Sequence, residues 1–93
     1  SMTLSADDID VMSALEEDLA KQALPRLLDL RNKVNAGGTL SKSDIGFLSQ
    51  VIHHARQSKQ LMDLSSEWHV FYDELLQIHS DIVNQAMDNV ERA

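Results

Sequence analysis

Cysteine is absent from this 93-residue chain, and proline, glycine and aromatic residues are scarce. Without cysteine the chain has no disulfide framework and no thiolate metal site. No apolar run approaches the roughly 20 residues that a membrane-spanning helix needs, and no charged-then-apolar leader opens the sequence. We therefore expect a cytoplasmic protein that does not enter a membrane.

One sign of charge is also scarce in each part of the chain, because acids and bases lie in separate blocks. Residues 1–24 carry six acids and one base, residues 25–62 six bases and two acids, and residues 63–93 seven acids and one base. The net charge of −7 would repel a phosphate backbone, and the basic middle block has no interleaved aromatic residues for base stacking. We expect no nucleic-acid binding. The blocks either help the terminal segments pack beside the middle one or are ordinary solvated faces.

Strand signals are missing, because no run rich in β-branched or aromatic residues alternates with a period of two. Apolar residues recur instead every three or four positions, which predicts helices over about 6–36, 42–62 and 66–91. Pro25 interrupts the first of these segments, so we expect a kink near residue 25 or a true break.

The predicted helix ends carry local signals. Gly37 would supply a left-handed C-cap to the first helix. Ser41 and Asp44 have the spacing of a capping box at the start of the second. Short connections make neighbouring helices antiparallel. Residues 1–93 are thus predicted to form a single all-α domain, an elongated antiparallel three-helix bundle, or a four-helix one if the first helix breaks at Pro25.

The last helix carries an apolar arc of roughly half its circumference, wider than the ~100° of an ordinary surface helix. An elongated bundle with a thin core would cover such an arc by self-association, so we expect a homodimer or a helical protein partner. The alternative is a compact monomer whose own helices cover the arc, with the aromatic residues in the core. The interface candidates on this arc are Trp68, Phe71, Tyr72, Leu76, Ile78 and Met87.

Two polar residues fall where apolar ones are expected, Glu16 on the first helix and His79 on the last. Burial without a hydrogen-bond partner would be costly for either side chain. We predict that each has a partner and that they could pair with each other. Otherwise a carboxylate, carbonyl or water satisfies His79, or one of the two residues is exposed.

The segment from His53 to Ser58 loosely resembles the phosphoacceptor box of histidine-kinase dimerisation hairpins. The resemblance implies that His53 or His54 accepts a phosphoryl group on an exposed helix face. This chain departs from that box, because His54 stands where the box has an acid and Ser58 where it has proline. Intact-mass measurement after incubation with a small phosphodonor would test the idea.

Other chemistry finds little support in the residue patterns. His69 and Asp73 are four residues apart and share a helix face, but no Glu-x-x-His or His-Glu-x-x-His motif is present. We predict no metal site and no cofactor; a bundle metal site using Glu16, His79 and a second copy is the weakest alternative. No cysteine, serine elbow or phosphate loop is available for catalysis, and no small-molecule substrate is indicated.

These patterns together predict a small acidic helical module for protein–protein interaction or regulation, with no catalytic activity of its own. A histidine phosphoacceptor or dimerisation module is the alternative, and a metal-binding helical bundle is a more distant one.

Overall fold

The protein is described by a computed structural model covering residues 6–58 and 66–93, apart from several side chains within 8–20 and those of residues 66–68. This described part contains three α-helices, α1 (Ala6–Asn35), α2 (Lys42–Gln57) and α4 (Ser66–Arg92), and no strand. The prediction of an all-helical fold is confirmed.

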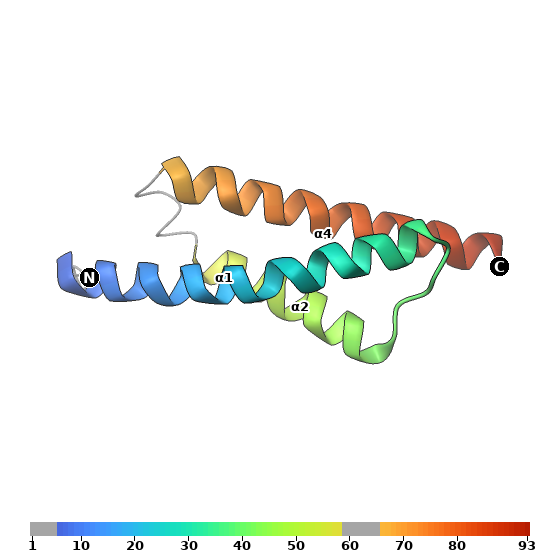
Figure 1. Cartoon of the computed structure of the whole chain (residues 1–93), viewed down its shortest axis with the longest axis horizontal. Coiled ribbons are helices and arrows are strands. Elements are labelled where there is room, and N and C mark those ends of the chain that lie inside the picture. Colours follow the sequence, from blue (N-terminus) through green and yellow to red (C-terminus); the bar gives the residue numbers. More distant parts are fainter. Residues whose placement is uncertain (1–5, 59–65) are drawn as a thin grey trace.

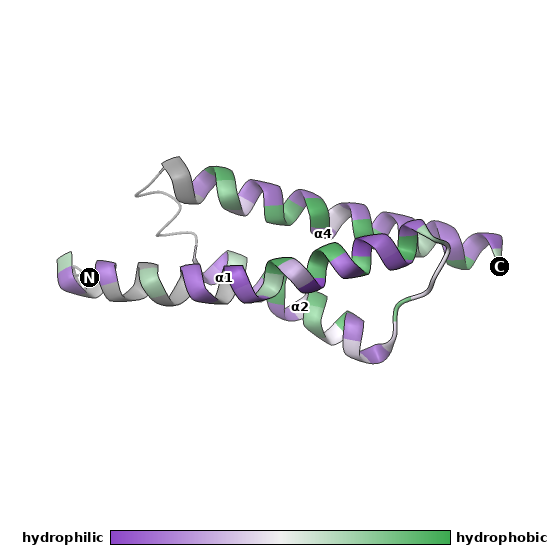
Figure 2. Cartoon of the chain, in the orientation of Figure 1, coloured by the Kyte–Doolittle hydropathy of each residue, from purple (hydrophilic) through white to green (hydrophobic). Residues whose placement is uncertain are grey.

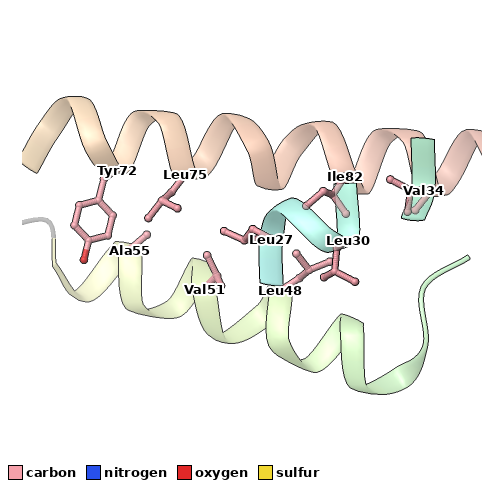
Figure 3. Packing of buried hydrophobic residues seen from close by; sticks show 10 residues of the cluster. Leu27, Leu30, Val34, Leu48, Val51, Ala55, Tyr72, Leu75 and Ile82 are labelled. Carbon is pink, nitrogen blue, oxygen red and sulfur yellow. The ribbon is translucent and has the colours of Figure 1, made fainter. Parts of the chain in front are cut away.

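The helices lie along a molecule of 52 × 23 × 21 Å. In Figure 1, α1 and α4 run side by side in the same direction, and α2 runs back toward the start of α4. The N-terminal end of α2 diverges from α4, both in this view and in the close-up of Figure 3. Apolar and polar residues alternate around each helix, as expected for amphipathic helices that bury one face (Figure 2).

The core joins all three helices in the half of the molecule where α2 is present (Figure 3). Its residues lie on the apolar stripes that the helical periodicity predicted. Leu27, Val34 and Ile82 are fully shielded from solvent. The other buried apolar residues are Leu30, Leu48, Val51, Ala55, Tyr72, Leu75 and Ala86.

The end of α1 has the geometry that the sequence predicts. Gly37 has a φ of +92°, the left-handed region that glycine adopts without steric cost. Its amide donates to the Val34 carbonyl at 3.0 Å, and the Gly38 amide donates to the Lys33 carbonyl at 2.9 Å. These two bonds form a Schellman C-cap, which reverses the chain toward α2.

The start of α2 is a complete capping box. The Asp44 amide donates to Ser41 Oγ at 3.1 Å, and the Ser41 amide donates to Asp44 Oδ2 at 2.9 Å. Two amides at the helix start that would otherwise lack partners are thereby satisfied.

The structure excludes one alternative for the first helix and gives an earlier end for the second. α1 continues through Pro25 without a break, so the four-helix alternative does not hold for the described residues. A proline inside a helix removes one backbone hydrogen bond, and the packing of Leu27, Leu30 and Val34 offsets that loss. α2 ends at Gln57, not near residue 62. The Ser58 amide and hydroxyl both donate to the His54 carbonyl and close its last turn.

Candidate functional site

An open groove of about 760 Å³ lies between α2 and α4. It forms where α2 diverges from α4. The side chains of the two helices face each other there and are in contact along only part of the groove. Most of its lining is apolar. The lining residues are Thr39, Leu40, Ile45, Leu48, Ser49, Ile52, His53, Arg56, His79, Val83, Ala86, Met87, Val90 and Glu91.

The groove collects the exposed apolar surface of the chain. Ile45, Met87 and Val90 are 56%, 59% and 64% exposed, and all three line it. Among the described residues, the one further large hydrophobic side chain that is exposed is Val70, on α4 outside the groove. Scattered exposed apolar residues are ordinary on a protein surface, whereas these three share one groove.

His79 stands at the inner wall of the groove and ties its two sides together. Its Nε2 lies 2.9 Å from the Leu48 carbonyl, across the space between α4 and α2. Because a carbonyl only accepts, Nε2 carries the proton in this contact. The prediction that a carbonyl, carboxylate or water satisfies His79 is confirmed by this bond. The side chain of Glu16 lies outside the described residues, so its pairing with His79 stays a prediction.

The two ends of the groove carry opposite charge. Arg56 and His53 lie on α2 toward its C-terminal end, and Glu91 lies near the C-terminus of α4. Since α2 and α4 run in opposite directions, Arg56 and Glu91 mark opposite ends. Both side chains are exposed.

Asp44 positions the α2 wall of the groove against α1. Its Oδ2 accepts from Lys33 Nζ at 2.8 Å, and its Oδ1 lies 3.8 Å from Arg26 Nη2. The hydrogen bond from Lys33, together with the Ser41 amide, lowers the pKa of the Asp44 carboxyl to about 2, although burial opposes the shift. Arg26 also donates to Ser43 Oγ and lies over the Phe47 ring, 4.4 Å from its centroid.

Asn89 holds the α4 wall near the end of α1. Its Nδ2 donates to the Val34 carbonyl at 2.7 Å and to the Gly38 carbonyl at 3.0 Å, and its Oδ1 accepts from Gln85 Nε2. The bonds tie α4 to two carbonyls at the C-terminal end of α1, of which that of Val34 also accepts from the Gly37 amide. Met87 and Val90, on either side of Asn89 in the sequence, are thus carried by an anchored segment.

No protein-family model matches the chain, and no curated protein and no solved structure matches it significantly. The groove is therefore interpreted from its own residues.

The structure places the predicted interface candidates on α4, and their role in an interface stays a prediction. Of the five candidates whose side chains are described, Met87 alone lines the groove. Tyr72 is buried in the core, and its hydroxyl donates to Ser58 Oγ at 3.1 Å. Phe71, Leu76 and Ile78 are half-buried and pack against the same core. The side chain of Trp68 lies outside the described residues. The chain covers most of the wide arc with its own helices.

Sequence reasoning missed the α2 side of the surface. Ile45 and Ile52 lie on the apolar stripe that the helical spacing gives α2. Ile52 is half-buried and Ile45 is exposed, since α2 leans away from α4 at its N-terminal end. The available signal was an α2 stripe wider than one neighbouring helix can cover.

Three of the four histidines, His53, His54 and His69, lie outside the core and outside any metal-binding group of the described residues. His53 is exposed and His54 half-buried, with ring centroids 6.4 Å apart. Phosphorylation of either residue stays a prediction. His69 Nδ1 lies 3.0 Å from Asp73 Oδ2 on an exposed face, as their spacing suggested. The described residues contain no group of three or more side chains placed to bind a metal ion. No helix among them is long and apolar enough to span a bilayer.

Proposed function

We propose that this chain is a small helical interaction or regulatory module that self-associates and has no catalytic activity of its own. The observation that carries the proposal is the gathering of Ile45, Met87 and Val90 in one open groove between α2 and α4. In this proposal α2 packs antiparallel to both α1 and α4, and contact with another molecule would complete the bundle.

A helix is the partner that such a groove accommodates best. Two diverging helices leave an elongated apolar channel, and an amphipathic helix places one apolar stripe into a channel of this kind. The added helix would give the arrangement of a helical bundle with one further member.

The exposed apolar area supports a weak association. Covering the exposed parts of the three side chains in both copies of a dimer would contribute roughly 5–11 kcal/mol, at about 1.5–3 kcal/mol for each fully buried residue. A Kd of about 1 µM requires about 8 kcal/mol, and association also has an entropic cost. The half-buried groove residues must supply the difference, so we expect a Kd of about 1–100 µM.

Sedimentation velocity of the full chain at concentrations from about 1 to about 300 µM tests the proposal. The wild type should change from a monomer to a dimer over this range. Met87→Glu should remain monomeric, because dimerisation would bury an unpaired carboxylate. Val70→Glu is the matched control, since Val70 is 58% exposed on the same helix but lies outside the groove.

The control variant should dimerise like the wild type, and both variants should keep their helical circular dichroism. A wild type that stays monomeric to about 300 µM would contradict self-association. If Met87→Glu dimerises as tightly as the wild type, the groove does not form the dimer contact.

A further inference from the structure

We propose that the partner in the groove is a second copy of this chain in an antiparallel, two-fold arrangement, with Arg56 of each copy facing Glu91 of the other. The inference rests on the proposed self-association and adds its geometry. It follows from the charges at the groove ends, their separation and the apolar residues between them.

The separation of the two charges follows from the helix register. His79 and Leu48 lie at the same level, because the His79 ring bonds to the Leu48 carbonyl. Arg56 follows Leu48 by eight residues on α2, and Glu91 follows His79 by twelve on α4. At 1.5 Å per residue in opposite directions, the two charges lie roughly 30 Å apart along the groove.

A two-fold axis across the groove brings opposite charges together. In such an interface residue i of one copy meets residue j of the other, and j meets i. Rotation about an axis near the groove midpoint, close to Ile45 and Val83, places the Arg56 end of one copy on the Glu91 end of the other. A parallel arrangement would place like charge against like charge, which is unfavourable.

Arg56 and Glu91 are available for this contact. Within the part of the chain that the structure describes, neither forms an ion pair with another residue of the same copy. Two cations of α1 that lie near α2, Lys33 and Arg26, are already engaged, since both contact Asp44.

The size and pattern of the face also fit a second copy. A patch roughly 30 Å long on a molecule 21–23 Å across has an area of at most about 600–700 Å² for each copy. Stable interfaces begin at about that area per partner. Ile52, Val83 and Met87 lie between the charged ends, so apolar contacts would occupy the centre and charges the rim.

Two charge-reversed chains test this arrangement by sedimentation velocity. Arg56→Glu alone would bring two carboxylates together at each end of the dimer, and Glu91→Arg alone would bring two guanidinium groups together there. Because both contacts of the dimer then join like charges, each variant alone should dimerise about tenfold more weakly, or worse. In an equimolar mixture of the two variants, the heterodimer joins opposite charges at both ends, and one of its ends has the wild-type contact.

The mixed heterodimer therefore gives a sharper test than either variant alone. One of its ends joins the two unchanged residues, Arg56 and Glu91, and the other joins the two substituted ones, again with opposite charge. The mixture should consequently associate about as tightly as the wild type.

Glu74→Arg is the control for the change in net charge, since Glu74 is exposed on α4 and lies outside the groove. It should not rescue Arg56→Glu in a mixture. Failure of the Glu91→Arg mixture to restore association would overturn the two-fold arrangement. If both single variants dimerise like the wild type while Met87→Glu does not, the arrangement is wrong and the groove still forms the contact. A monomeric wild type would overturn both proposals.

Discussion

Asp44 combines several polar contacts beside the groove. It closes the capping box with Ser41, receives the Lys33 ammonium and lies near Arg26, and its side chain is only 12% exposed. A carboxylate in this setting is stabilised in its charged form by donors on both α1 and α2. Its charge therefore stabilises the position of α2, and with it the width of the groove.

The pH dependence of stability should report this carboxylate. Its pKa is about 2 in the folded chain against 3.8 in the unfolded one. A lowered folded pKa means that the stabilisation is fully present above 3.8 and is lost as the pH falls through about 2. Asp44→Asn should lower the free energy of unfolding by about 1–2 kcal/mol at pH 7. Urea unfolding should show this difference shrinking to near zero as the pH approaches 2.

Asp29→Asn is the control, because Asp29 is exposed on α1 and forms no described hydrogen bond or ion pair. Its effect should stay within about 0.5 kcal/mol. A difference between Asp44→Asn and the wild type that does not change between pH 7 and pH 3 would contradict the assigned role.

Residue-scale features were predictable where they depend on near neighbours. The Ser41–Asp44 box and the left-handed Gly37 follow from local spacing, and the structure has both. The bonds of Asn89 to Val34 and Gly38 join positions more than fifty residues apart. Nothing in the local pattern around Asn89 indicates these acceptors, because they exist only after α4 packs beside α1.

At the scale of elements, α1 shows how packing overrides a local signal. Pro25 predicts a kink or a break, and α1 continues from Ala6 to Asn35 without a break. Proline at this position has no amide hydrogen to donate within the helix. The two turns that follow contribute Leu27, Leu30 and Val34 to the core, so tertiary contacts keep the segment helical.

Pro25→Ala should therefore stabilise the fold. Alanine restores the missing amide and favours helix by up to about 3 kcal/mol, so we expect a gain of about 1–3 kcal/mol and a rise in Tm of several degrees. Thermal unfolding followed by circular dichroism measures it. Gln22→Ala, an exposed change on the same helix, should shift stability by less than about 0.5 kcal/mol. A destabilised Pro25→Ala protein would mean that the proline geometry is required for packing.

The type of each secondary-structure element was predictable from the sequence. Which face of each helix is buried was predictable only in part. Helical periodicity gives the three helices, but it cannot say which of two neighbours covers each side of a wide stripe. Phe71, Leu76 and Ile78 turn toward the core, whereas Ile45 and Val90 do not. The difference comes from the divergence of α2, which is a property of helix packing and not of any single helix.

At the scale of the whole molecule, the groove follows from the way a short α2 lies against two longer helices. α1 and α4 lie side by side, and α2 covers only part of that pair (Figure 1). A chain of this size has little apolar surface to spare for its core. Three exposed apolar side chains in one groove are therefore most simply explained by a contact that covers them.

The central claim is that a second copy covers the α2–α4 groove. An isotope-filtered NOE experiment on an equimolar mixture of ¹³C-labelled and unlabelled full-length chain, above the dimerisation midpoint, tests it most directly. We predict intermolecular cross-peaks from the Met87 and Ile45 methyl groups and none from the Val70 methyls. Cross-peaks from Val70 in place of Met87 and Ile45, or no intermolecular cross-peak at all, would contradict the claim.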